Sequence, residues 1–366
     1  MQPRTAMLAP TVLKGRIVSL RAIAKLRRAL AAGIAFALIV LSAESATADD
    51  EALIAAAQKE GSVVWYTTQI INPLVLALTS AFEKKYDVRV DYVRANASEI
   101  VLRLADEARA GKTVADVYDG TTVGEALKRQ GLAERWLPDD ALTFPPDYRD
   151  PDGYWVAQNF YVITAAFNTN LIPAGREPKN WNDLLDPKYR GQIAWAGSAS
   201  VSAGAGFVGI VLKQLGDEKG RAYLAKLARQ KIAAIDAAAR VVVDQLIAGE
   251  YALGLQIFPE HADESAAKGA PVKWIAMEPG MSAIVSTTGI VKSPPHPNAA
   301  RLFLAYMISE EGQKIFRDAF YNPANPKVSP LDADLAPGRN HLIFLTPGEV
   351  VDAMPQWMKT YNEFFR

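Results

Sequence analysis

Short apolar runs rich in β-branched and aromatic residues alternate along this chain with longer segments in which apolar residues recur at helical spacing. The alternation begins after residue 60, where the run 63–66 ends in the hydroxyl-bearing Thr67 and Thr68. Strands that alternate with helices in this way are typical of a parallel sheet in an α/β fold. In the first part of the chain we predict strands at 63–66, 88–92 and 115–118 and helices at 50–60, 72–86 and 98–110.

A Pro-rich passage, residues 137–154, separates this series from a second one, and we interpret it as a surface loop. The apolar run 156–167 predicts a strand that crosses between two lobes, and the run 284–290 predicts a strand that returns the chain to the first. We further predict strands within 189–198 and at 232–235 and 253–257, and helices at 181–185, 203–215, 218–230, 240–248, 297–308, 310–320 and 347–365.

The first 48 residues have the pattern of an export signal. Five Lys or Arg between residues 16 and 28 precede an apolar run at 29–41 and an A-x-A sequence at 46–48. The run is shorter than the ~20 apolar residues that span a membrane. Removing 48 of the 366 residues leaves 318, which suggests two domains.

The order of predicted elements gives a domain organisation. We predict a signal peptide over 1–48, a first lobe built from 49–157 and 284–331, a second lobe over 158–283, and a C-terminal helical tail over 332–366. Two α/β lobes joined by crossovers hold a ligand between the loops at strand carboxyl ends and the helix N-termini. Such lobes close around the ligand by a hinge motion.

Charge and composition narrow the class of partner. The chain has 40 Lys and Arg and 40 Asp and Glu, but residues 1–48 hold seven Lys or Arg and one Glu, so the remainder carries about −6. A negative mature chain argues against nucleic acid or an anionic membrane as partner. The absence of Cys from the sequence excludes disulfides, thiolate chemistry and a lipid-modified Cys at the cleavage point. We expect a free, monomeric protein of the Gram-negative periplasm.

Five segments, taken in order, resemble the periplasmic solute-binding proteins of ABC importers with the type II fold, in the branch that contains the ferric-ion-binding proteins. The segments are 61–68 (GSVVWYTT), 81–92 (AFEKKYDVRVDY), 115–120 (ADVYDG), 241–255 (VVVDQLIAGEYALGL) and 287–314. The resemblance covers nearly all of the mature chain. It implies two α/β lobes with mixed sheets and flanking helices, an interlobe cleft and a hinge. It also implies a protein that hands its solute to a membrane permease.

The iron ligands of that branch are absent from the matching positions. Ferric-ion binders hold iron with a His after the first strand, a Glu after the third and a tandem Tyr pair in the second lobe. These positions fall here at Ile70, near Thr121, and at Phe258 and Pro259. None of the four offers the hard anionic oxygen or imidazole that Fe(III) needs. We therefore expect no metal.

Polar residues follow each predicted strand of the first lobe. Thr67, Thr68 and Gln69 come after the first strand and offer donors to a ligand, although helix capping explains a Thr equally well. Ser98 opens the next helix, either as a cap or as part of an anion site. Thr121 follows the Asp-Gly pair after the third strand, where an ordinary turn is the alternative.

In the second lobe, the loop at 197–206 (GSASVSAGAG), between a strand and a helix, is a clearer candidate for ligand binding. A small, hydroxyl-rich turn of this kind makes an anion-binding nest. We assign Ser200, Ser202 and Ala203 to ligand binding, with tight helix–strand packing as the alternative. Arg240 begins a helix, against the helix dipole, and is a candidate clamp on a carboxylate or phosphate unless it pairs with a nearby Asp.

Aromatic and amide side chains at strand ends complete the candidate site. Tyr161, Gln256 and Phe258 lie near the expected hinge or at the end of a second-lobe strand, where a ring could stack on an organic ligand or belong to the core. A G-x-G-x-x-G match at 204–209 lies eight residues past the strand end at Ala196, too far for a dinucleotide turn. We expect no cofactor.

These observations favour a periplasmic receptor that captures a small anionic solute and delivers it to an ABC permease. A ferric-iron receptor is the main alternative. A secreted α/β hydrolase is a second, although the sequence contains no G-x-S-x-G elbow, no H-E-x-x-H and no Cys nucleophile. A binding subunit that reports to a membrane sensor is a third.

Overall fold

The computed structural model describes residues 50–336 and 339–366. The signal peptide predicted at 1–48 lies outside the described residues. Residues from Ile54 to Arg366 form one compact unit, and the description below concerns this unit. Within the described ranges, no helix combines the length and the apolar character needed to cross a membrane.

The first lobe is built on three parallel strands in the order β2-β1-β3. Apolar side chains of these strands pack against α3 and α4 on one side, while Trp65 of β1 meets Phe303 of α9 edge to face at 5.4 Å on the other. The elements are β1 (Ser62–Thr67), α2 (Leu76–Tyr86), β2 (Arg89–Arg94), α3 (Ala97–Arg109), β3 (Val117–Gly120), α4 (Val123–Arg129), α9 (Pro297–Ile308) and α10 (Glu310–Asp318).

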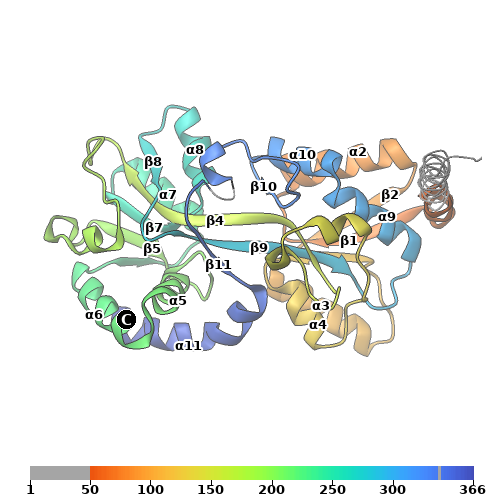
Figure 1. Ribbon diagram of the computed structural model, residues 1–366, viewed down its shortest axis with the longest axis horizontal. Coiled ribbons are helices and arrows are strands. Elements are labelled where there is room, and N and C mark those ends of the chain that lie inside the picture. The colour runs from red at the N-terminus through yellow and green to blue at the C-terminus, as the bar shows by residue number, and fades with distance from the viewer. Residues whose placement is uncertain (1–49, 337–338) are drawn as a thin grey trace, which may run out of the picture. The chain divides into compact units, whose positions relative to one another are not determined.

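Two long antiparallel strands, β4 (Val156–Asn168) and β9 (Met281–Ile290), run from one lobe into the other (Figure 1). Residues 287–290 of β9 pair with β3 in the first lobe. Residues 164–168 of β4 pair with β7 and β8 in the second. Nearly every residue of both strands is buried, which explains their continuous apolar sequence. The predicted crossover at 156–167 and the return at 284–290 therefore exist.

The second lobe repeats the α/β pattern around parallel pairs of β5 with β6 and β7. Its core contains Trp181, Trp195, Phe207, Leu224 and Leu253, all nearly or fully buried. The elements are β5 (Ile193–Ala196), α5 (Gly204–Leu215), α6 (Asp217–Leu227), β6 (Ala233–Ile235), α7 (Ala239–Ala248), β7 (Leu253–Ile257), α8 (Pro259–Ala267) and β8 (Val272–Ile275).

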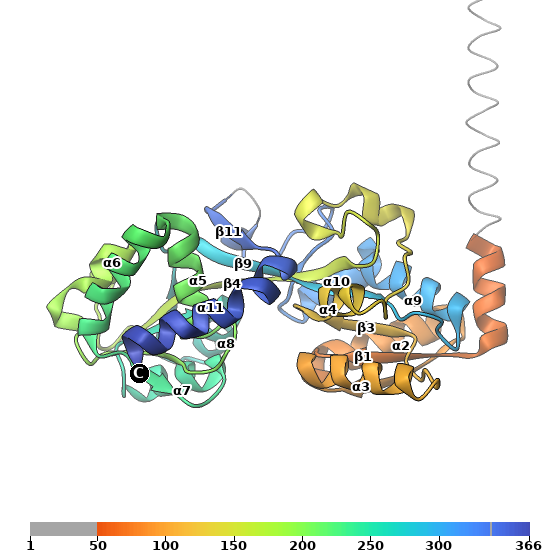
Figure 2. The same cartoon turned by 90° about the horizontal axis from the view of Figure 1, so that it is seen from below.

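The C-terminal segment contains β10 (Asn322–Pro323), β11 (Leu342–Leu345) and the long helix α11 (Pro347–Phe365). Strand β11 pairs in parallel with β9. Trp357 of α11 fills the space over Gly209 of α5, where a Cβ would lie 2.5 Å from the indole. At its other end α11 reaches the first lobe, because Asp352 pairs with Arg129 of α4. Figure 2 shows α11 extending from the second lobe toward α4.

The fold class predicted from the sequence, a two-lobed α/β protein with mixed sheets, is confirmed. Two predictions of local structure were wrong. The helix predicted at 72–86 is a regular α-helix only from Leu76, because a π-helical segment at Ile71–Val75 precedes it, and Asn72, before Pro73, takes extended angles there (φ −118°, ψ 123°). The passage 137–154 is more than a surface loop, because Phe144 and Tyr148 are buried within it.

Candidate functional site

Loops from both lobes enclose a cavity of about 730 Å³, here called the α11-side cavity. The first lobe contributes the segments after β2 and β3, and the second contributes the segments after β5 and β6. A volume of this size suits a small molecule. The lining residues are Asn96, Ala97, Ser98, Thr121, Thr122, Ser198, Ala199, Ser200, Val201, Asp236, Ala237, Ala238, Val350, Val351 and Met354.

Three helices begin at this cavity. Asn96, Thr122 and Ala238 are the N-caps of α3, α4 and α7, and all three line it. The first turn of a helix leaves backbone N–H groups without intrahelical partners, and the helix dipole places partial positive charge there. The N-cap side chains of α4 and α7 bond none of these N–H groups, although the Gly124 N–H in the first turn of α4 donates to the Thr287 hydroxyl at 3.0 Å. Their N–H groups are therefore suited to an anionic ligand.

The serine-rich loop before α5 is held in shape from behind. The Gln256 Nε2 donates a 2.7 Å hydrogen bond to the Val201 carbonyl oxygen. A Cβ on Gly206 would overlap the same carbonyl, so this position requires glycine. In front, the Ser200 and Ser202 hydroxyls lie 3.1 Å apart. Gln256 is 4% exposed and has a left-handed backbone (φ 60°), so in this structure it supports the loop.

A second cavity of about 650 Å³, here called the α8-side cavity, also has walls from both lobes. The segment after β1 forms one wall, and the start of α8 forms another. Its lining residues are Thr68, Ile70, Asn72, Pro73, Tyr161, Phe258, Glu260, His261, Glu264, Ala267, Lys268, Ala319, Phe320 and Tyr321.

Asp119, at the end of β3, is a fully buried carboxylate next to this cavity wall. Its Oδ1 accepts hydrogen bonds from the Thr68 N–H at 2.9 Å, the Thr68 hydroxyl at 2.6 Å and the Gln69 amide at 3.3 Å. Burial raises the pKa of Asp119 in spite of these donors, and its Oδ2 has no partner among the described residues. Asp119 thus fixes the loop that follows β1.

All of the predicted site residues except Arg240 fall into three groups. Ser98, Thr121 and Ser200 line the α11-side cavity, with Ser202 and Ala203 continuing the same loop. Thr68, Tyr161 and Phe258 line the α8-side cavity. Thr67, Gln69 and Gln256 are buried behind these walls.

Arg240 lies outside the lining of both cavities. Its guanidinium pairs with Asp244 at 3.1 Å and lies 3.8 Å from Glu264. Sequence analysis missed Glu260 and Tyr321, because they approach Tyr161 only through tertiary folding, and it missed the wall formed by α11.

The positions that hold iron in the resembling branch carry side chains unsuited to it. Ile70 is 52% exposed, and Phe258 packs on Tyr161 at 5.4 Å. In the part of the chain that the structure describes, no group of three or more His, Cys, Asp or Glu is arranged to hold a metal ion.

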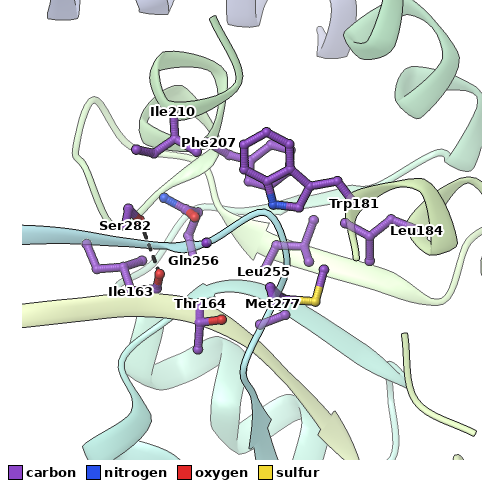
Figure 3. Close-up of a pocket in the computed structure, with 12 residues that line it drawn as sticks. Ile163, Thr164, Trp181, Leu184, Phe207, Ile210, Leu255, Gln256, Met277 and Ser282 are labelled. Carbon is purple, nitrogen blue, oxygen red and sulfur yellow. Dashed lines mark hydrogen bonds between the residues drawn. The ribbon is translucent and has the colours of Figure 1, made fainter. Parts of the chain in front are cut away.

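A third cavity lies inside the second lobe and is too small for a solute. Its volume of about 20 Å³ suits one water molecule. Figure 3 shows Trp181, Phe207 and Leu255 around it, and the Ser282 hydroxyl donating to the Ile163 carbonyl at 3.1 Å. This cavity is a packing feature of the core.

Comparisons with known proteins identify the family of the chain. Residues 115–345 match the model of the family described as bacterial extracellular solute-binding protein. The Fe(3+)-binding periplasmic protein of Serratia marcescens is 27% identical over 320 residues, covering 82% of this chain and 91% of that protein. An uncharacterized protein of Haemophilus influenzae is 26% identical over 274 residues, covering 72% of this chain and 78% of that one.

Solved structures share the fold. Iron-bound HitA from Pseudomonas aeruginosa superposes with a TM-score of 0.71 at 22% identity, covering 82% of this chain and 99% of that one. AfuA from Actinobacillus pleuropneumoniae, with fructose-6-phosphate bound, superposes with a TM-score of 0.68 at 21% identity. The match covers 83% of this chain and 98% of that one. The prediction of a solute receptor is confirmed, and the hydrolase alternative finds no support. The chain belongs to the family of bacterial extracellular solute-binding proteins.

Proposed function

We propose that this protein is a periplasmic receptor that captures a small anionic solute in the α11-side cavity and delivers it to an ABC permease of the inner membrane. The observation that carries the proposal is the convergence of the N-termini of α3, α4 and α7 on one cavity between the lobes. The positive ends of three helix dipoles directed at one space stabilise negative charge.

The lining chemistry narrows the solute further. Among the described residues that line the cavity, none is Lys or Arg, so the anion meets helix N-termini and hydroxyls such as those of Thr121 and Ser200. Asp236 also lines the cavity, and because an ionised carboxylate accepts hydrogen bonds and donates none, its favourable partner on a solute is a donor such as a hydroxyl. A hydroxylated anion meets both requirements. The fructose-6-phosphate bound to the related AfuA fold is a solute of this kind.

Capture proceeds by closure of the lobes around the solute. The lobes are connected by β4 and β9, and we propose that these strands bend near the boundaries predicted at 157/158 and 283/284. The closed form then docks on the permease. We propose that residues 1–48 direct export and are removed, so that the free protein acts in the periplasm.

Ala238→Glu tests the anion site, because Ala238 is an exposed N-cap that lines the cavity. A solute screen by thermal shift comes first, with inorganic phosphate, hexose phosphates, carboxylates, neutral hexoses and ferric citrate. A ligand at a hundredfold excess over its Kd stabilises the folded state by ~2.7 kcal/mol. We expect one anion to raise the Tm, and Ala238→Glu to weaken its binding by about tenfold or more through charge repulsion.

Ala222→Glu is the matched control, since Ala222 is exposed on α6 away from the cavity lining, and it should bind as the wild type does. Equal affinity for a neutral hexose and its phosphate would contradict the anionic solute. A Tm rise with ferric citrate alone, together with charge-transfer colour, would support the iron receptor instead.

A further inference from the structure

Three aromatic residues line the α8-side cavity, and the Tyr161 ring contacts the other two at interplanar angles of about 60°. Tyr161 packs edge to face against Phe258, with ring centroids 5.4 Å apart, and against Tyr321 at 6.2 Å. The three residues come from β4, from the start of α8 and from the segment after α10. Aromatic rings in a cavity wall suit an ammonium group, because each ring face carries negative quadrupole charge.

A carboxyl group faces the same space. Glu260 lies in the first turn of α8 and lines the cavity, and its Oε2 is buried without a partner among the described residues. A buried carboxyl oxygen without a donor is costly unless a ligand supplies one or the group is protonated. Burial, with a smaller contribution from the charge of Asp263, raises the pKa of Glu260 to about 8.

The other charged groups at this cavity are already neutralised or paired. Lys268 Nζ binds Glu264 Oε1 at 2.7 Å, and Arg240 lies 3.8 Å from the other oxygen of Glu264. Burial lowers the pKa of His261 to about 4, so its ring is neutral at neutral pH. Glu260 therefore remains the acidic group available to a ligand.

The cavity mouth carries features that packing alone does not account for. Phe320 is 52% exposed and has a left-handed backbone (φ 66°), which is unfavourable for a bulky residue. Ile70 at the same mouth is also 52% exposed. Strained and exposed apolar residues of this kind are more common at ligand sites than in surface loops.

We propose that the α8-side cavity binds an organic ammonium group, with the Glu260 carboxylate as counter-ion and Tyr161, Phe258 and Tyr321 as its aromatic walls. Aromatic walls without other hard ligands favour an alkylated ammonium over a metal ion. This cavity shares no lining residue with the α11-side cavity, so the inference goes beyond the anionic solute proposed above.

Proton release accompanies binding. Below pH 8 the carboxyl of Glu260 is protonated in the empty cavity, and the arriving cation displaces its proton. The titratable groups that face it are Tyr161 and Tyr321, whose pKa values are both raised by burial, and Asp263 on its own helix. Since both tyrosines stay neutral to pH 9, Glu260 accounts for the proton.

Calorimetric titration with choline tests the site, and 3,3-dimethylbutan-1-ol, its uncharged isostere, is the control ligand. We expect wild-type protein to bind choline about tenfold or more tightly than the isostere, and to bind it more tightly at pH 8 than at pH 6. Heats measured in buffers of different ionisation enthalpy should report about one proton released at pH 6.5.

Glu260→Gln keeps the shape of the side chain and removes its charge. We expect this variant to lose about tenfold in choline affinity, to lose the proton release, and to bind the isostere unchanged. Glu264→Gln is the matched control on the same helix and should change choline affinity by less than about threefold, because Lys268 already pairs with that carboxylate.

Equal binding of choline and the isostere by the wild type overturns the proposal without reference to any variant. Equal losses in Glu260→Gln and Glu264→Gln would also overturn it, since they indicate diffuse attraction and no specific counter-ion. Ala238→Glu should leave choline affinity unchanged. Failure of choline to bind while the anion still binds contradicts this inference alone, and the reverse result contradicts the anionic solute alone.

Discussion

Glu260 and Glu264 lie one turn apart on α8, yet their surroundings shift their pKa values in opposite directions. Burial raises the pKa of Glu260 to about 8 from an ordinary value of 4.5. The hydrogen bond from Lys268 lowers the pKa of Glu264. Two residues of the same type on one helix therefore couple folding to pH with opposite signs.

Glu260→Gln should remove a loss of stability that the wild type shows with rising pH. Between pH 4.5 and about 8 the folded state retains a proton on Glu260 that the unfolded state has lost, so the free energy of unfolding falls as pH rises. Urea denaturation at pH 5, 7 and 9 measures the free energy of unfolding. The difference between variant and wild type should shift in favour of the variant as pH increases.

Glu264→Gln should behave in the opposite way in the same experiment. The lowered pKa of Glu264 stabilises the folded state above its ordinary pKa, and this contribution is lost as pH falls. The variant should therefore be less stable than the wild type at neutral pH and should approach it in acid. Identical pH profiles for the two variants would contradict both assignments.

At the scale of elements, segments with strong hydrophobic patterns have nearly the predicted bounds. Strand β7 has the predicted bounds, and α7 begins one residue before the prediction and ends where Gly249 takes a left-handed angle. Short strands without periodicity were missed: β8, β10 and β11 are defined by their partners β4 and β9. A strand of two to four residues carries too little pattern to be recognised locally.

Some residues of the candidate site could be placed from the sequence, and others could not. Parallel strands bring their carboxyl ends to one edge, so Ser98 and Thr121 could be placed together from topology. The meeting of Tyr161, Glu260 and Tyr321 depends on three segments far apart in the sequence, and no local pattern indicates it. For Arg240 the sequence offered an anion clamp or a pairing with a nearby Asp; the pairing with Asp244 is local, whereas the approach of Glu264 depends on the position of α8.

Trp357→Ala tests the docking of α11. The indole is 6% exposed and packs over Gly209, so its removal leaves a cavity and should lower the free energy of unfolding by ~3–5 kcal/mol. Chemical denaturation monitored by circular dichroism measures the change. Gln356→Ala, exposed on the same helix, should change it by less than ~0.5 kcal/mol. A similar small change for both would mean that α11 contributes little to stability.

At the scale of the whole molecule, three connections between the lobes are present among the residues that the structure describes. Strands β4 and β9 extend their hydrogen bonding into both lobes, and α11 packs on the second-lobe core while Asp352 pairs with Arg129 of the first. Both side chains of that pair are substantially exposed, so its energy is small and compatible with opening and closing. The continuous strands are the connections that unfolding must break.

Thermal unfolding should therefore occur as one transition. Because β4 and β9 belong to the cores of both lobes, the loss of either lobe removes partners from the other. Scanning calorimetry should give a calorimetric enthalpy equal to the van't Hoff enthalpy. Asp352→Asn should leave this ratio unchanged. Two resolved transitions, or a ratio well above one, would show that the lobes unfold independently.

The position of α11 also bears on how related genes can recombine. Residues 169–280 form one continuous insertion between β4 and β9, so an exchange with a relative needs only two junctions. However, Trp357 and Tyr361 arrive from beyond the second junction and pack against side chains encoded inside the exchanged block. A viable chimera must therefore inherit the C-terminal codons together with this block, which links two separated stretches of the gene during their divergence.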